Sequence, residues 1–342
     1  MVGHAEGLAA PAGPRSLPAQ PLSGFLLRRL AASLLLLLLV LTFTFLFLRL
    51  IPGDPVDSFE SQHLTAAQHL KLRQLYGLDR PLPEQYLHWL ASVARWDWGV
   101  SLSQQRPVST ALLEVLPATA VLALAGLAVE YALALLLGIA SALRRGSALD
   151  HAVRVVTLLF YSQPLFWLGL MAVLLFSHVW PVLPSSHMRS VDADLMSPPA
   201  RLLDLARHLV IPALVIGLGT AGGTARFLRG SLIEVMSQDY IRTARAKGLS
   251  GWRVVWVHGM RNAVVPLIQV FSLSLPLLLS GALIAEVVFS WPGLGRLTYG
   301  AILARDYPLI LGATALSATL VILGNLLADV LHALADPRIR DA

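Results

Sequence analysis

Six long apolar blocks run along the chain, and the segments between them hold most of its charged residues. The blocks cover 30–48 and about 118–143, 153–177, 209–228, 264–288 and 308–333. A helix needs about 20 mostly apolar residues to cross the hydrocarbon core of a bilayer, and each block has about that length. The pattern therefore predicts an all-α, polytopic membrane protein with about six transmembrane helices.

The first block is interpreted as an uncleaved membrane helix. A secretory signal would have a shorter apolar region and a small-residue cleavage site. This block instead has full spanning length and is followed by Pro52-Gly53-Asp54-Pro55. That stretch suits a rigid turn at the membrane surface, with receptor docking as the alternative role. Short helices are expected after it, at 65–76 and 83–98.

These patterns divide the chain into consecutive regions. Residues 1–26 are rich in Pro, Ala and Gly and are expected to form a disordered cytoplasmic N-terminus. The other regions are a first transmembrane helix at 27–49, an external loop region at 50–113, a transmembrane core at 114–335 with an inner loop at 229–262, and a cytoplasmic C-terminus at 336–342.

Composition agrees with the membrane class and excludes several kinds of site. The 342 residues are 56% hydrophobic and 13% charged, whereas soluble domains carry about 25% charged residues. The net charge is +6, but the arginines flank the apolar blocks and form no basic stripe for nucleic acid. Cysteine is absent, which excludes disulfides, thiolate metal ligands and cysteine nucleophiles.

The placement of Lys and Arg sets the expected orientation, because cytoplasmic loops carry an excess of both. With the N-terminus inside, the inner segments include the short loop at Arg144 and Arg145 and the densely basic stretch 226–261. Both termini are then cytoplasmic, and the long segment 50–113 is external.

The inner segment between the fourth and fifth blocks is the main candidate for a functional site. It is polar, basic and compatible with a helix up to Gly248, a residue that suits a helix C-terminus. A compact helix across the inner surface can be gripped by a soluble partner, whose motion would reach the adjoining membrane helices. The alternative is an ordinary basic loop that obeys the charge rule. The candidate residues are Glu234, Asp239, Tyr240, Arg242, Thr243, Ala244, Arg245, Lys247 and Gly248.

Motifs along most of the chain carry a resemblance to a known family. They are RLIPGDP at 49–55, YGLDRP at 76–81, WGVS at 98–101, SQDYIRTARAKG at 237–248 with RNAVVP at 261–266, EVVFSWPGLGR at 286–296 with ARDYP at 304–308, and DPRIR at 336–340. In this order they resemble the permeases of ATP-binding-cassette (ABC) importers, in detail the dipeptide/oligopeptide/nickel branch. The stretch 237–248 looks like the cytoplasmic coupling ("EAA") loop of that family. Arg242 and Thr243 depart from the general pattern in the way the peptide branch does, while Ala244 and Gly248 fit it.

The resemblance implies a type I ABC importer permease fold within a complex of two permeases and two ATPases. This chain is similar to the first of the two permeases, in a prokaryotic plasma (inner) membrane. The implied partners are a second homologous permease, one or two ABC ATPase subunits, an external solute-binding protein and the lipid bilayer. The implied cargo is peptides or related small solutes, nickel chelates included.

Nucleotide chemistry is expected on other chains. A Walker A loop needs Gly-Lys-Ser/Thr, and neither Lys71 nor Lys247 is followed by Ser or Thr. ATP and Mg²⁺ are therefore assigned to a partner ATPase, and the chain is expected to hold no cofactor and no catalytic residue. The histidines are scattered without a metal-binding motif, so no metal site is predicted.

Single residues within and beside the apolar blocks carry further expectations. Glu130 is the candidate for the translocation path, because ionisable residues inside a membrane are costly and often functional. The alternative is a structural carboxyl at a helix interface. The glycines at 217, 219, 222 and 223 predict a small-residue surface for close helix packing. Trp291 is expected in a turn at the membrane boundary, where Trp is enriched.

Two other protein classes would leave different marks. A secondary transporter would need buried charge pairs or paired broken helices at the midplane, and Glu130 alone is thin support. An intramembrane enzyme would need a nucleophile with a base, or a metal motif, within the apolar blocks, and the sequence contains neither.

Overall fold

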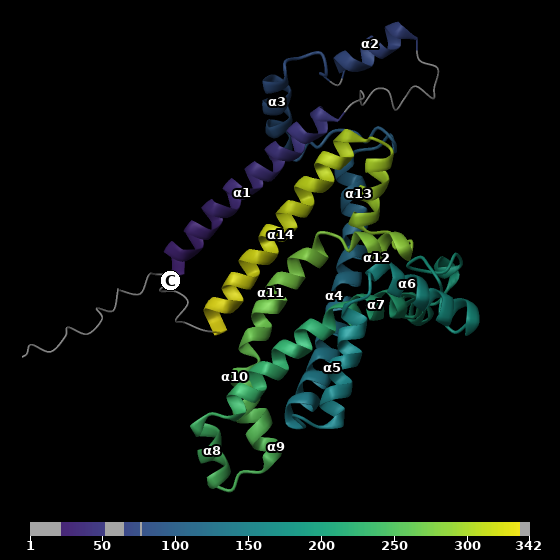
Figure 1. The fold of residues 1–342 in the computed structure, drawn as a ribbon. Coiled ribbons are helices and arrows are strands. Elements are labelled where there is room, and N and C mark those ends of the chain that lie inside the picture. The colour runs from purple at the N-terminus through teal and green to yellow at the C-terminus, as the bar shows by residue number, and fades with distance from the viewer. Residues whose placement is uncertain (1–21, 52–64, 76, 336–342) are drawn as a thin grey trace, which may run out of the picture.

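The computed structural model describes residues 22–51, 65–75 and 77–335, which are almost entirely helical (Figure 1). The elements are α1 (Leu22–Leu50), α2 (Ala66–Leu75), α3 (Leu82–Ala94), α4 (Val108–Leu143), α5 (Ala148–Tyr161), α6 (Leu165–Val173), the π-helical η2 (Leu174–Val179), the 3-10 turn η3 (Ala193–Leu195), α7 (Pro198–Met236), α8 (Asp239–Ala246), α9 (Gly251–Arg253), the π-helical η4 (Val254–Gly259), α10 (Met260–Ala263), α11 (Val265–Leu279), α12 (Leu283–Val288), α13 (Leu294–Leu303) and α14 (Tyr307–Ala335). Over these ranges the chain forms no strand and only an isolated bridge between Val100 and Pro107. The all-α class is confirmed.

The predicted number of about six membrane helices is reached when two bent helix pairs each count as one crossing. Four single helices, α1, α4, α7 and α14, are long and apolar enough to span a membrane. In chain order, the third crossing is α5 with α6 and η2, bent by 97°, and the fifth crossing is α9 to α10 with α11, bent by 50°. Pro164 lies at the first bend, where it disfavours helical geometry in the residue before it.

Different short helices lie at the two ends of the helical bundle. Figure 1 shows α2 and α3 at one end and α8 and α9 at the other. Helices α1 and α14 run side by side, and Arg29 Nε lies 3.3 Å from Asp329 Oδ2. Because this ion pair joins the beginning of α1 to the end of α14, both lie toward the same end of the bundle.

The hydrophobic core consists of apolar clusters that lie along α4 and the helices packed on it. One apolar cluster joins Phe45 of α1 to the starts of α4 and α14. A second joins α4, α6 and α7 to the fully buried Phe289 and Trp291. A third lies lower along α7, between Leu228 and Met260 of α10. The bundle is thus packed along the whole length of α4 and α7.

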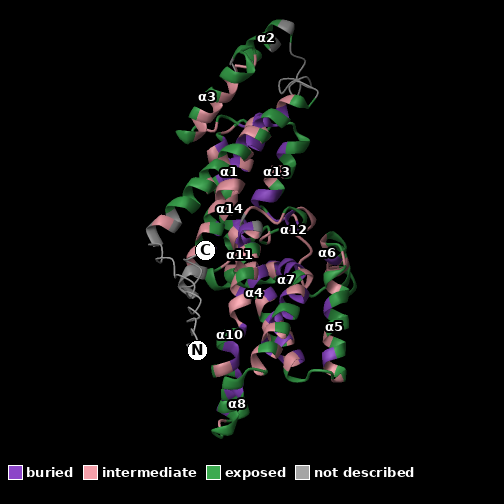
Figure 2. Ribbon diagram, turned by 60° about the vertical axis from the view of Figure 1, so that its left-hand side comes forward, coloured by how far each residue is buried: buried purple, intermediate pink, exposed green. Residues whose placement is uncertain are grey.

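Many large apolar residues are nevertheless exposed, and the ribbons of α1 and α5 are largely coloured as exposed in Figure 2. Phe43 is 70% exposed and Leu159 is 60% exposed. Exposed apolar area of this extent is not tolerated on a monomeric soluble protein. Lipid or the helices of a membrane partner would cover it, which agrees with the membrane class.

Two of the four glycines that were predicted to form a small-residue surface on α7 lie at close helix contacts. A Cβ at Gly217 would lie 2.4 Å from Val129 Cγ1 on α4, and one at Gly222 would lie 2.6 Å from the Thr157 carbonyl oxygen on α5. The same atom at Gly219 or Gly223 would be 3.5 Å from its nearest neighbour, which is ordinary contact. The small-residue surface therefore exists, but Gly217 and Gly222 are its tight points.

The observed helix boundaries differ from the predicted region boundaries at several places. Helix α1 begins at Leu22, so residues 22–26 are helical and not part of a disordered terminus. Helix α4 begins at Val108, before the predicted end of the external region at 113. The fifth block is two helices, α11 and α12, separated at Gly281, whose φ is +109°. The expectations for 1–21, for the turn at Pro52–Pro55 and for 336–342 lie outside the described residues.

Candidate functional site

Helix α8 is a short helix fixed to the bundle by a small apolar anchor. Ile241 is fully buried and Ala244 is 6% exposed, and both pack on Val254 of η4. The partly buried Met236 and Leu249, from the flanking segments, complete the cluster. The helix ends at Ala246, Lys247 is its C-cap, and Gly248 follows with φ +76°, a left-handed conformation that favours glycine.

The other face of α8 is polar and open. The side chains of Asp239 and Arg242 are 94% and 75% exposed and form an ion pair at 3.2 Å. Exposed pairs of this kind contribute about 0.2–1 kcal/mol, so the apolar anchor and not this pair holds the helix. The remaining exposed candidates are Glu234, Thr243, Arg245, Lys247 and Gly248. Ala244 belongs to the anchored face.

Tyr240 ties α8 to the base of the fifth crossing. Its hydroxyl oxygen accepts a hydrogen bond from Asn262 Nδ2 of α10 at 2.8 Å. The candidate loop is therefore attached to α7 by its own chain, to η4 by Ile241 and to α10 by Tyr240. A force on its exposed face would be passed to both neighbouring membrane helices.

A buried ionic network lies on α7 between the candidate loop and the bundle. Arg229 donates from Nε and Nη2 to the two carboxylate oxygens of Asp150 at 2.8 and 2.9 Å. The fully buried Asp150 also accepts from Ser141 Oγ and from Gly146 N. The network joins the end of α4, the start of α5 and α7. The sequence analysis did not predict this network. One signal for the start of α5 was visible, because Ser147 is a favoured N-cap residue. Its hydroxyl oxygen accepts from Asp150 N.

Glu130 lies inside the contact between α4 and α7. It is 1% exposed, and its Oε1 accepts from Thr224 Oγ1 at 2.6 Å. Oε2 has no hydrogen-bond partner in the described part of the chain. This position corresponds to the helix-interface alternative.

A second buried carboxylate organises the segment between the last two crossings. Glu286 is fully buried, accepts from Thr119 Oγ1 of α4 at 3.1 Å and accepts from Arg296 N at 2.9 Å. Thr119 Oγ1 in turn accepts from Leu294 N at 2.7 Å. The carboxylate thus caps the start of α13 and ties it to α4, a role that the sequence did not reveal.

Trp291 lies between α12 and α13, where a turn was expected, but its side chain does not face the surroundings of the protein. Its side chain is fully buried, and its Nε1 donates to the Ala118 carbonyl oxygen of α4 at 2.8 Å. The boundary preference of Trp arises because its N–H seeks a polar partner. Here a backbone carbonyl inside the protein supplies that partner.

The described residues bring no three His, Asp or Glu side chains together in a way that could hold a metal ion. The site is therefore an array of exposed polar groups on an anchored helix, backed by buried hydrogen-bond networks. Such an array can bind a protein surface and transmit its movement.

Comparisons with known proteins agree with this arrangement. Residues 134–341 match the family described as binding-protein-dependent transport system inner membrane component, and residues 22–123 match the N-terminal region of such components. The di/tripeptide transport system permease protein DppB of Pseudomonas aeruginosa is 40% identical over 330 residues, which cover 92% of this chain and 98% of that protein.

Two further relatives are similar over nearly their whole length. The dipeptide transport system permease protein DppB of Escherichia coli K12 is 36% identical over 92% of this chain and 98% of its own. The oligopeptide transport system permease protein AppB of Bacillus subtilis is 34% identical over 93% and 99%. Among solved structures, the inward-facing MetNI methionine ABC transporter matches with a TM-score of 0.45 at 18% identity, over 65% of this chain and 92% of that chain.

Proposed function

This chain belongs to the family of binding-protein-dependent transport system inner membrane components, and from that premise we propose that it forms half of the translocation path of an ATP-driven peptide importer. A second homologous permease forms the other half. ATP hydrolysis takes place on one or two partner ABC ATPase subunits, where ATP and Mg²⁺ bind. An external solute-binding protein delivers the cargo.

The observation that carries the proposal is the construction of α8. A helix with an apolar face fixed to the bundle and a polar face left open is suited to insertion into a groove of a soluble partner. Its anchor at Ile241 and its hydrogen bond at Tyr240 connect it to the fifth crossing, and α7 leads directly into it. Closure of an ATPase pair around α8 would therefore tilt both crossings together.

The orientation follows from the same helix. The end of the bundle that carries α8 is the cytoplasmic one, since the basic stretch 226–261 lies there and cytoplasmic loops are enriched in Lys and Arg. The start of α1 and the end of α14 lie toward this end. Both termini are then cytoplasmic, and α2 and α3 face the receptor on the outside.

The proposed cargo is peptides or related small solutes, nickel chelates included. It rests on the names of the relatives, which are described as di/tripeptide, dipeptide and oligopeptide permeases. Glu130 remains a candidate for the path in another conformation. Its burial between α4 and α7 supports the structural alternative in this one.

The complete complex reconstituted in vesicles tests the mechanism. We expect peptide uptake and ATP hydrolysis that are both stimulated by the external receptor and both lost when the partner ATPases are inactivated. Uptake that survives ATPase inactivation and collapses with an uncoupler would show a secondary transporter instead.

A charge reversal on α8 tests the assigned interface. Asp239→Arg places a cation on the exposed first turn of α8, where it would repel a site adapted to a carboxylate and destabilise the helix start. We expect membrane insertion to be retained and co-purification of the ATPase subunits to fall. Asp192→Arg, on an exposed loop far from α8, is the matched control and should leave assembly unchanged. Equal ATPase recovery with both variants would refute the interface.

A further inference from the structure

A pocket of about 260 Å³ lies beside α13, in the half of the molecule that carries α2 and α3 (Figure 1). Three parts of the chain enclose it. They are α13 with the turn before it, α4 at Val115, and the loop before α4 at Ser103 and Gln104. The coupling role proposed for α8 uses none of these residues.

The pocket lies near the outer end of the membrane-spanning part of α4. The backbone N of Leu294, the first residue of α13, donates to Thr119 Oγ1 of α4 at 2.7 Å. Thr119 is 11 residues from Glu130, the centre of the second apolar block, a separation of about 16 Å along a helix. Half of the hydrocarbon core is about 15 Å thick. In the proposed orientation, the start of α13 is therefore open to water on the external side.

The pocket presents side-chain donors, and no acidic side chain of the described residues lines it. Arg296 is exposed, and its Nη1 donates to the Ser290 carbonyl oxygen at 2.6 Å. A guanidinium has five N–H donors, and within the described ranges this carbonyl is its only partner. On the loop, Gln104 Oε1 accepts from Arg106 Nε at 2.8 Å, which leaves the Gln104 Nε2 donor available. The polar lining is therefore suited to a ligand with anionic and carbonyl oxygens.

The turn that carries Arg296 is fixed by the bonds around it. Ser290 has φ +51°, a conformation that is costly for residues other than glycine and persists only where its surroundings hold it. Trp291 Nε1 bonds to α4, and the buried Glu286 accepts from the backbone N of Arg296, not from its guanidinium. A donor that is positioned in advance loses little freedom when it binds.

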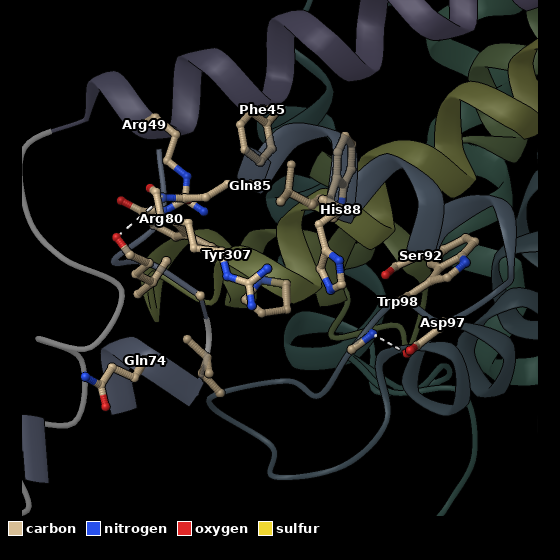
Figure 3. Close-up of a pocket in the computed structure, with 17 residues that line it drawn as sticks. Phe45, Arg49, Gln74, Arg80, Gln85, His88, Ser92, Asp97, Trp98 and Tyr307 are labelled. Carbon is tan, nitrogen blue, oxygen red and sulfur yellow. Dashed lines mark hydrogen bonds between the residues drawn. The ribbon is translucent and has the colours of Figure 1, made fainter. Parts of the chain in front are cut away.

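A larger cavity near α3 lacks this arrangement. It holds about 340 Å³ between the ends of α1 and α14. Figure 3 shows Arg49 and Arg80 on one side of it and Trp98, with the carboxylate of Asp97, on the other. One small ligand cannot contact both sides, so this cavity offers no single anion site.

We propose that the pocket beside α13 receives the C-terminal end of the peptide cargo at the outer mouth of the translocation path. The proposal rests on the peptide-import function and adds a contact on this chain. Arg296 pairs with the terminal carboxylate, whose planar geometry a guanidinium can match with two parallel hydrogen bonds. Gln104 Nε2 donates to a peptide carbonyl oxygen, and Val115 and Leu297 pack on the last side chain.

The chemistry of the ligand follows from what all linear peptides share. Each has one terminal carboxylate, whatever its side chains, so the contact at Arg296 is independent of the peptide sequence. Whole small ligands occupy about 300–1,000 Å³. A pocket of about 260 Å³ accordingly takes the end of a peptide and leaves the rest in the path.

The test compares a peptide that has a free C-terminal carboxylate with the same peptide as its C-terminal amide. The peptide is one that the external receptor binds in both forms, and the receptor is loaded with one form before it is added to the complete complex in vesicles. ATP-driven uptake then gives a ratio of acid to amide. Because every permease variant meets the same loaded receptor, a change in this ratio reports on the permease.

Three variants separate the carboxylate contact from other effects. Arg296→Gln should lower the ratio about tenfold, the size expected for one lost hydrogen bond to a charged group. Arg296→Lys keeps the charge and should recover part of the ratio. Arg305→Gln is the matched control, since Arg305 is an exposed arginine just beyond the other end of α13 and does not line the pocket. Incomplete folding of a variant lowers both uptake rates and cancels in the ratio.

The outcomes decide between a peptide and a protein ligand for Arg296. A ratio that falls in Arg296→Gln and is unchanged in Arg305→Gln supports the proposal. An unchanged ratio in Arg296→Gln, or equal loss of acid and amide uptake, overturns it. Weaker docking of the loaded receptor to Arg296→Gln, with the ratio unchanged, would assign Arg296 to an acidic group of the receptor and also overturns it. Absence of ATP-driven uptake of either form by the wild-type complex would refute the importer function itself.

Discussion

The contact between α7 and α5 at Gly222 allows a sharp test of how the bundle is packed. A Cβ added there would lie 2.6 Å from the Thr157 carbonyl oxygen and 3.2 Å from its carbon. Both atoms belong to backbone, so no side chain can rotate away. Restoring a contact of 3.4 Å requires α5 to retreat by about 0.8 Å, the difference between the two distances.

The expected energy has two terms of opposite sign. Forcing an extra group into a packed interface costs about 1–3 kcal/mol. Replacing Gly by Ala in a helix gains about 1 kcal/mol through backbone entropy and helix propensity. Gly230→Ala isolates the second term, because Gly230 lies on the same helix and a Cβ there meets nothing within 4 Å. The difference between the two variants should therefore equal the packing term alone.

Thermal unfolding of the purified complex, followed by tryptophan fluorescence, measures this difference. We expect Gly222→Ala to unfold at a lower temperature than the wild type and Gly230→Ala at the same or a higher temperature. A Gly222→Ala midpoint equal to that of Gly230→Ala would mean that α5 and α7 do not meet closely at this point.

Two further variants test the buried hydrogen bonds. Trp291→Phe keeps an aromatic ring in the core but leaves the Ala118 carbonyl without the indole donor; it should lower stability by about 1–3 kcal/mol, and an unchanged thermal midpoint would refute a role for that bond. Arg229→Gln removes the bidentate cation from the buried Asp150 and leaves the longer ion pair with Arg154 at 3.6 Å; we expect a lower thermal midpoint and weaker receptor stimulation of ATP hydrolysis, with partial recovery in Arg229→Lys. Wild-type stimulation in Arg229→Gln would exclude the network from the coupling route.

The helices could be predicted because crossing a bilayer imposes a length and a composition that are local in sequence. Each apolar block satisfies that condition by itself. The break in the fifth block could not be predicted in the same way. Gly281 adopts φ +109°, and a Cβ there would lie 2.7 Å from Gly295 N. The break therefore depends on a neighbour from another helix, which no local pattern contains.

The buried networks escaped prediction for a related reason. Arg229 and Asp150 are 79 residues apart in the chain, and Glu286 and Thr119 are 167 apart. In the sequence Arg229 is simply one of many inner basic residues, and Glu286 ends an apolar block. The family resemblance marked the segment around Glu286 but gave no contacts. Only the packing of α4 against α7 and α13 shows which carboxylate meets which donor.

Helix α7 connects these features into one mechanical path. It pairs with α4 through Thr224 and Glu130, with α5 through Arg229 and Asp150, and it continues into α8. A surface loop tethered at one point would swing without moving the bundle. Helix α8 is held by α7 on one side and by Ile241 and the hydrogen bond of Tyr240 on the other. We therefore expect that movement imposed on its open face shifts α7 and the fifth crossing together. Through α7 it would also shift α4 and α5, which are hydrogen-bonded to α7.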